Sequence, residues 1–140
     1  MGVDGATFHS AMFSTGADFG GAEFPYGADF GSATFSKTAS FNAATFNIAH
    51  FDAATFSDHI TFINAEFTGS AKFADARFES QPPDFRGAKM HEATELHGVV
   101  WPRPSRNKAD AQQQVYAYER LKQEMEQRKK HEDEQKLFSQ

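Results

Sequence analysis

The sequence predicts an all-β solenoid in residues 1–104, followed by an α-helical segment in residues 105–140. Three observations lead to this fold class. Phenylalanine recurs every five or six residues through most of the first segment. Alanine stands two positions before nearly every one of these phenylalanines. After Gly98 the chain contains no glycine, and a run rich in Gln, Glu, Lys and Arg follows, which is typical of a helix.

The phenylalanine repeat extends through most of the first segment. Fifteen of the 16 phenylalanines belong to it, and Phe138 alone lies outside. Alanine precedes 13 of these 15 by two positions, and Ile60 and Pro83 replace it in the other two cases. Other apolar residues continue the series. The predicted core is therefore Phe8, Phe13, Phe19, Phe24, Phe30, Phe35, Phe41, Phe46, Phe51, Phe56, Phe62, Phe67, Phe73, Phe78, Phe85, Met90, Leu96 and Trp101.

The spacing fits neither an amphipathic helix nor a long half-buried strand. A helix needs apolar residues every three or four positions, and a strand needs sustained alternation. Here alanine and phenylalanine alternate once, as in a three-residue strand, and small or polar residues then turn the chain. Repetition of this unit builds a coil whose turns stack about 4.8 Å apart. Alanine and phenylalanine would fill the interior in layers, and the other positions would face outward.

The repeated unit resembles that of the pentapeptide-repeat proteins. Matching units include ADFGS at 28–32, ASFNA at 39–43 and AEFTG at 65–69, and the resemblance covers about residues 6–101. It implies a right-handed, quadrilateral β-helix with one unit on each side. The eighteen central residues would then make four to five coils. The chain departs from the usual family pattern because phenylalanine, and not leucine, fills nearly every central position.

The intervals between phenylalanines alternate, so that the frame is an 11-residue double unit. The interval from Phe46 to Phe51 alone is one residue shorter than this frame requires. With four sides per turn, the additional residues would align on two opposite corners. The widest irregularity is residues 79–83, where two prolines favour a protruding loop.

The second segment, 105–140, is predicted to be one amphipathic and highly charged α-helix. Either Asn107 or Asp110 is a suitable N-cap residue. The tract YERLKQEMEQRKKHEDE at 118–134 is similar to tails of some bacterial members of the family, in which more chain follows, sometimes with membrane spans. The helix could cap the last coil near Leu96 and Trp101, form a homodimer, or link to further chain. Its apolar stripe includes Ala111 and four possible interface residues, Val115, Tyr118, Leu121 and Met125.

Composition excludes several classes of protein. The absence of cysteine excludes a disulfide framework and thiolate metal sites. The formal charge of -5 argues against direct nucleic-acid binding by neutralising phosphates. No run approaches the roughly 18 apolar residues of a membrane span, and the N-terminus does not resemble a signal peptide. We therefore expect a cytoplasmic protein, or the cytosolic side of a membrane protein.

The sequence shows no pattern that indicates catalysis or a cofactor. Five histidines of the repeat region are scattered, and their spacing does not converge on a metal site. We find no nucleophile elbow and no glycine-rich phosphate loop between a strand and a helix. We therefore expect no catalytic, cofactor or metal site. The histidines in question are His9, His50, His59, His91 and His97.

The leading hypothesis is a non-catalytic structural module that presents an extended surface to a protein partner. The family resemblance suggests two alternatives: a DNA mimic that binds the type II topoisomerase DNA gyrase, and the cytosolic N-terminal part of a larger membrane protein. A DNA mimic needs a continuous acidic surface. The outward residues that directly precede phenylalanines form one candidate face, namely Asp18, Glu23, Asp29, His50, Glu66, Lys72 and Arg77.

Overall fold

The computed structural model describes residues 5–91, 93–103, 106–109, 111, 112, 115, 119, 123 and 126. Within these residues the chain forms short β-strands of two residues each, one residue shorter than the strands that the sequence predicts. The strands are β1 (Ala6–Thr7), β2 (Met12–Phe13), β3 (Ala17–Asp18), β4 (Glu23–Phe24), β5 (Ala28–Asp29), β6 (Thr34–Phe35), β7 (Ala39–Ser40), β8 (Thr45–Phe46), β9 (Ala49–His50), β10 (Thr55–Phe56), β11 (Ile60–Thr61), β12 (Glu66–Phe67), β13 (Ala71–Lys72) and β14 (Arg77–Phe78).

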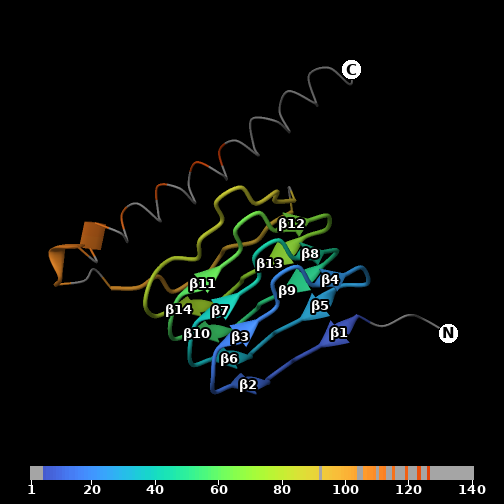
Figure 1. The fold of residues 1–140 in the computed structure, drawn as a ribbon, viewed down its shortest axis with the longest axis horizontal. Coiled ribbons are helices and arrows are strands. Elements are labelled where there is room, and N and C mark those ends of the chain that lie inside the picture. Colours follow the sequence, from blue (N-terminus) through green and yellow to red (C-terminus); the bar gives the residue numbers. More distant parts are fainter. Residues whose placement is uncertain are drawn as a thin grey trace.

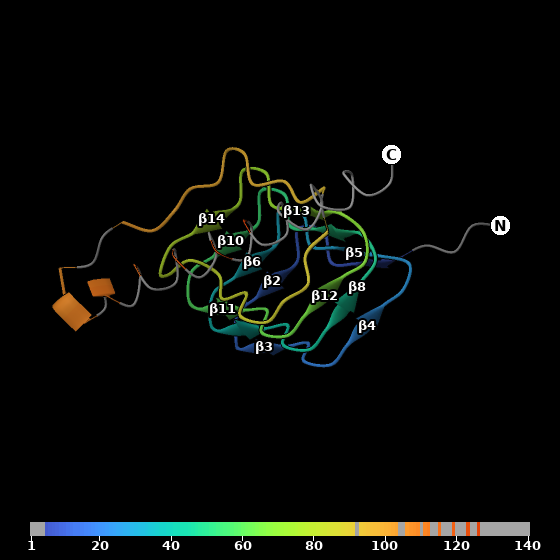
Figure 2. The same ribbon diagram turned by 90° about the horizontal axis from the view of Figure 1, so that it is seen from above.

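The strands pair in parallel and form a β-solenoid, as the sequence predicts. Every fourth strand joins the same sheet, so that the chain visits four sheets in turn (Figure 1). We name the sheets after their first strands: the β1 face (β1-β5-β9-β13), the β2 face (β2-β6-β10-β14), the β3 face (β3-β7-β11) and the β4 face (β4-β8-β12). Two faces contain four strands and two contain three, and Figure 2 shows the strands of the β2 face lying side by side.

Strand pairing defines the length of each coil. On the β1 face Ala6 pairs with Ala28, Ala28 with Ala49, and Ala49 with Ala71, which gives coils of 22, 21 and 22 residues from the differences in numbering. The 22-residue coil is two 11-residue double units, and the 21-residue coil contains the short interval after Phe46. The predicted number of four to five coils is not established, because only isolated bridges such as Thr61–Asp84 extend the ladders beyond β14.

The phenylalanine rings form four stacked columns inside the solenoid. Successive rings within a column lie 4.7–5.2 Å apart with nearly parallel planes, for example Phe30 over Phe51 at 5.2 Å and 3°. Rings of the β1 and β3 faces also meet edge to face, as Phe30 and Phe41 do at 5.2 Å and 83°. These are the two arrangements that aromatic pairs favour. Buried rings are Phe30, Phe35, Phe41, Phe46, Phe51, Phe56, Phe62, Phe67, Phe73, Phe78 and Phe85.

The remaining core residues lie at the two ends of the solenoid and are partly buried. At the N-terminal end the first coil contributes four such rings, and at the other end Trp101 stacks on Phe78 at 5.6 Å. End coils have a neighbouring coil on one side only, which explains the lower burial. The partly buried members are Phe8, Phe13, Phe19, Phe24, Met90, Leu96 and Trp101.

Two of the four corners are tight turns with a left-handed residue. Each turn is closed by a backbone hydrogen bond from the alanine of one unit to the central phenylalanine of the unit before it. In one example the Ala44 N–H donates to the Phe41 carbonyl oxygen at 3.1 Å. The residue before the donor has a φ of 57° to 73°, which matches position i+2 of a type II turn. Glycine is the usual residue there, yet the stacked ladder holds six other residues in this conformation. They are Ser10, Ser32, Ala43, Ala53, Asn64 and Asp75.

The prediction of a protruding loop at residues 79–83 is wrong for its two prolines, because both are buried. Pro83 takes the inward position that Ala39 takes two coils earlier, and its neighbour Asp84 pairs with Thr61. At this position the N–H donates to the following coil, as Ala39 N–H does to His59 O at 3.0 Å. No strand of the described residues follows Pro83 on the β3 face, so within this part of the chain proline interrupts no ladder bond.

The predicted C-terminal helix lies largely outside the described residues, and it stays a prediction. At its expected start, Asn107 Oδ1 accepts the Ala109 N–H and Asn107 O accepts the Ala111 N–H, both at 2.9 Å, which is the hydrogen-bond pattern of an N-cap residue. Val115 is 55 % exposed. The other three possible interface residues, Tyr118, Leu121 and Met125, lie outside the described residues.

Candidate functional site

The candidate functional surface consists of four columns of outward side chains, one on each face. Each of these residues directly precedes the central aromatic or apolar residue of its unit, and successive members are register partners in adjacent coils. The columns are Thr7, Asp29, His50, Lys72 and Glu95 on the β1 face; Met12, Thr34, Thr55, Arg77 and Val100 on the β2 face; Asp18, Ser40, Thr61 and Asp84 on the β3 face; and Glu23, Thr45, Glu66 and Lys89 on the β4 face.

The prediction that seven outward residues form one face is wrong. Residues that precede successive phenylalanines lie on successive sides of the coil, and the chain returns to a given face only after about 22 residues. The seven residues are therefore distributed over all four faces. Asp29, His50 and Lys72 are on the β1 face, Glu23 and Glu66 on the β4 face, Asp18 on the β3 face and Arg77 on the β2 face.

Several outward side chains brace the backbone of their own coil. Asp18 Oδ1 accepts the Gly20 N–H and Asp29 Oδ1 accepts the Gly31 N–H, both at 2.8 Å. Asp84 Oδ1 accepts the Arg86 N–H at 3.1 Å, and its carboxylate also binds the Arg86 guanidinium at 2.8 Å. These short-range hydrogen bonds stabilise the tight corners. Asp18, Asp29 and Asp84 therefore have a structural role in the coil.

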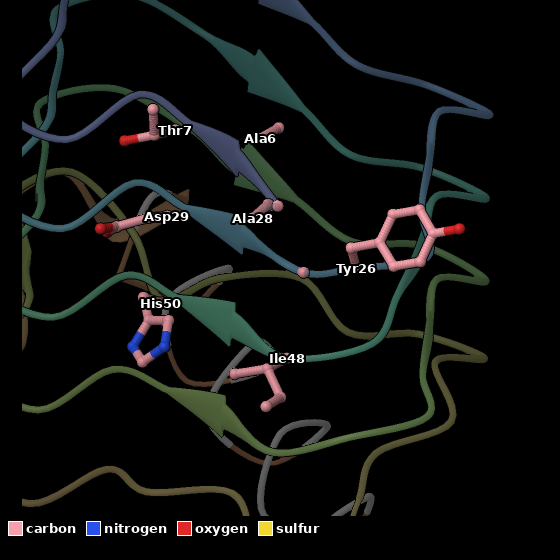
Figure 3. A pocket seen from close by; sticks show the side chains of 9 residues that line it. Ala6, Thr7, Tyr26, Ala28, Asp29, Ile48 and His50 are labelled. Carbon is pink, nitrogen blue, oxygen red and sulfur yellow. The ribbon is translucent and has the colours of Figure 1, made fainter. Parts of the chain in front are cut away.

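A shallow hollow of about 210 Å³ lies at the N-terminal end of the β1 face. Figure 3 shows Thr7, Asp29 and His50 in a column along one side of it, and Tyr26 on the other side at a corner. Tyr26 is 63 % exposed, and Ile48 is 41 % exposed in the short corner below it.

The order of side chains in this hollow does not suit acyl transfer. A nucleophile needs its base within hydrogen-bond reach. Thr7 pairs in register with Asp29, and Asp29 pairs in register with His50. The Thr7 hydroxyl and the His50 imidazole are therefore two coils apart, with Asp29 in the coil between them. Two coils correspond to about 10 Å at the usual strand spacing.

The pKa of the Asp52 carboxyl group is clearly displaced. Burial raises the pKa of its carboxyl group above 3.8, and the nearby His50 and Lys72 partly oppose this shift. His50 Nδ1 lies 3.9 Å from Asp52 Oδ2, whereas Asp52 Oδ1 is buried without a hydrogen-bond partner among the described residues. The carboxyl group is therefore more easily protonated than an exposed aspartate.

The five histidines that the sequence offers as possible ligands do not converge. His9 contacts Ser10, His59 lies beside Asp58, and His91 Nδ1 accepts the Ala93 N–H. Among the described residues, no group of three or more His, Asp or Glu side chains could hold a metal ion. The described part of the chain also has no helix with the length and hydropathy that crossing a bilayer requires.

A second hollow, of about 340 Å³, lies at the C-terminal end of the β2 face. Sequence reasoning did not find it, because it forms where Trp101 stacks on Phe78 and Val100 pairs with Arg77 in the coil above. Two arginines and the single tryptophan of the chain are among its lining residues. The lining residues are Arg77, Phe78, Glu79, Val100, Trp101, Pro102 and Arg103.

Comparison with known proteins agrees with the coil geometry. Residues 51–100 match the family model for pentapeptide repeats (9 copies). No curated protein and no solved structure matches the chain. The matched residues form the same four-sided coils as residues 6–50, with paired strands in register across the boundary. Residues 51–100 therefore consist of pentapeptide repeats.

Proposed function

We propose that this chain is a non-catalytic interaction module, a rigid rod that binds a protein partner through one of its outward columns. The observation that carries the proposal is the difference between the inward and the outward side chains of the solenoid. The aromatic side chains are used in stacked columns within the core, and the outward columns differ from one another in charge and polarity. Solenoid proteins typically bind partners through such extended faces.

The alternative of a DNA mimic is less well supported by the outward columns. A mimic needs carboxylates in an unbroken series, but Lys72 lies between His50 and Glu95 on the β1 face, and Lys89 follows Glu66 on the β4 face. The β2 column contains no carboxylate. We therefore expect no inhibition of supercoiling by gyrase at micromolar protein, and inhibition there would favour the mimic.

Site-specific photo-cross-linking tests the interaction module directly. A photoreactive amino acid replaces one outward residue on each face in separate variants: His50, Thr55, Thr61 and Thr45. Each replaced side chain faces outward, so we expect all four variants to fold. In an extract of the source organism we expect one face to capture the same protein repeatedly, at higher yield than the other three faces. Absence of capture from all four faces would contradict the proposed function.

A further inference from the structure

The hollow at the N-terminal end of the β1 face has an acidic side. Among the described residues that line it, Asp29 carries the one carboxylate, and none is a lysine or an arginine. Lys72 belongs to the same outward column, but His50 lies in the coil between them. Two coils separate Asp29 from Lys72 by about 10 Å at the usual strand spacing. A cation from another molecule therefore meets a carboxylate here without a basic side chain beside it.

Asp29 resembles Asp84 in its hydrogen bond but differs from it in its ion pairing. Both carboxylates accept the backbone N–H two residues later, at 2.8 and 3.1 Å. Asp84 also binds the guanidinium of Arg86 at 2.8 Å, whereas no ion pair of the described residues includes Asp29. A guanidinium group beside Asp29 would complete the arrangement that Arg86 completes beside Asp84.

An apolar ledge lies across the hollow from Asp29. Tyr26 and Ile48, which are both exposed, form this ledge at the corner (Figure 3). Between the ledge and the carboxylate, Gly27 contributes no side chain. Its φ is +98°, and a Cβ atom there would lie 2.9 Å from the Ile48 carbonyl oxygen, so the packing of the coils requires glycine. The hollow is therefore a bare groove with an aromatic ring on one side and a carboxylate on the other.

The size and the charge of the hollow indicate which occupant suits it. Its volume of about 210 Å³ is below the roughly 300–1,000 Å³ of sites that enclose a small molecule, so a single long side chain suits it better. Arginine combines an apolar stem with a planar guanidinium, which binds carboxylates and stacks on aromatic rings. Lys72 repels a cation in the coils that follow, and this confines the guanidinium to the level of Asp29.

We propose that the β1 face is the docking surface of the module, and that its partner is a basic protein segment that inserts an arginine side chain into this hollow. The guanidinium pairs with Asp29, the stem crosses the groove over Gly27, and Tyr26 and Ile48 cover the apolar part of the side chain. This inference rests on the proposed function, because it assigns the interaction to one of the four faces.

Binding of two labelled peptides to the full chain tests the charge of the occupant. The probes are a fluorescent peptide of alternating arginine and serine and its citrulline–serine counterpart, which keeps the shape of the side chain but lacks its charge. Fluorescence anisotropy at low salt measures the affinity of each. We expect saturable binding of the arginine peptide, and an affinity for the citrulline peptide that is lower by about tenfold or more. Binding is expected to weaken as salt screens the carboxylate.

Two aspartates with the same structural role provide a matched pair of variants that locates the site. Asp29→Asn removes the charge but keeps the oxygen that accepts the backbone N–H two residues later. Asp18→Asn makes the same change on the β3 face, where the corresponding hydrogen bond is also 2.8 Å long. Three residues before Asp18 the chain has Thr15, whereas Tyr26 stands three residues before Asp29. We expect Asp29→Asn to weaken binding of the arginine peptide by about tenfold or more, and Asp18→Asn by less than about twofold.

Tyr26→Ala tests the apolar ledge independently of the carboxylate. The side chain is exposed, so its removal should leave the fold intact. We expect the affinity for the arginine peptide to fall by about two- to fivefold, because the guanidinium loses the face of the aromatic ring. The melting temperatures of Tyr26→Ala, Asp29→Asn and Asp18→Asn, measured in the same buffer, verify that each variant is folded.

Three results would overturn the assignment. The first is no saturable binding of the arginine peptide by the full chain, which is the result expected if basic residues of the chain itself fill the hollow. The others are equal affinity for the citrulline peptide, and equal weakening by Asp18→Asn and Asp29→Asn. The cross-linking experiment separates this inference from the proposed function, since His50 lines the hollow. Capture of a partner through the β2, β3 or β4 face alone would overturn docking on the β1 face while the interaction module stands.

Discussion

Replacement of Phe41 by alanine is expected to lower the free energy of unfolding by about 3–5 kcal/mol, as for other fully buried aromatic residues. The Phe41 ring is 0 % exposed. It stacks between Phe19 and Phe62 within its own column, at 5.0 and 5.2 Å. It also meets the edges of Phe30 and Phe51 in the neighbouring column. Removing it leaves a cavity that the flanking coils cannot close, because their backbones are held in register by ladder hydrogen bonds.

Urea unfolding followed by circular dichroism measures the effect of Phe41→Ala, and two variants serve as controls. Asn47→Ala removes an exposed side chain whose Nδ2 donates a 3.3 Å hydrogen bond to Pro25 O, and it is expected to cost less than about 0.5 kcal/mol. Phe8→Ala, at the open end, is expected to cost about 1–2 kcal/mol because its ring is only partly buried. Similar losses for Phe41→Ala and Asn47→Ala would contradict the inward assignment of the aromatic rings.

Ala39→Pro is expected to cost about 3 kcal/mol or more, through the backbone and not through the core. Ala39 N–H donates to His59 O at 3.0 Å, and proline removes this donor from the middle of the β3 ladder. The His59 carbonyl oxygen then loses its hydrogen-bond partner. The variant should unfold at a clearly lower urea concentration than the parent chain.

Pro83 provides the native comparison for Ala39→Pro. Both residues occupy the same inward position of the β3 face, but Pro83 comes in the last coil described on that face, where no following strand accepts a hydrogen bond. Pro83→Ala restores a donor, and no strand of the described residues follows to accept its hydrogen bond, so we expect a cost below that of Ala39→Pro. If Ala39→Pro were as stable as the parent chain, the ladder would not hold the coils together as described.

The sequence was sufficient to predict the β-solenoid because one periodic signal encodes it. Alanine and phenylalanine alternate once and the chain then turns, and the parallel pairing of Ala28 with Ala49 and of Phe35 with Phe56 is the direct consequence. The short interval after Phe46 was visible in the spacing, and in the structure it yields a 21-residue coil without loss of register.

Other features depend on contacts between coils and left no clear signal in the sequence. Ala43 and Ala53 adopt positive φ although alanine disfavours it, because the ladder on either side determines their conformation. Pro83 was misread as part of a loop, since its effect depends on which coil follows it. The prediction that Asp18 and Arg77 share one face was wrong because neighbouring units occupy different sides of the coil. Only residues about 22 positions apart share a face, and applying this period to the sequence places Asp18 and Arg77 on different faces.

The hollow at Trp101 illustrates the same limit for the candidate site. Its residues come from two coils, Arg77 to Glu79 in one and Val100 to Arg103 in the next. Arg77 and Val100 are 23 residues apart, one more than a regular coil, because the interval before Phe85 is longer. The spacing alone did not determine how this longer coil folds. It therefore did not predict that Arg77 and Arg103 line the same hollow.

The most direct test of the four-sided coil is disulfide formation between introduced cysteines, since the chain has none of its own. Thr34 and Thr55 are register partners on the β2 face, although 21 residues separate them. Adjacent strands lie within the Cα distance of about 4.4–6.8 Å that a disulfide requires. We expect Thr34→Cys with Thr55→Cys to form an intrachain disulfide under mild oxidation. The control pair, Thr34→Cys with Thr45→Cys, lies on the opposite β2 and β4 faces and is expected to stay reduced. Closure of the control pair as readily as the first, or failure of the first to close, would contradict the solenoid.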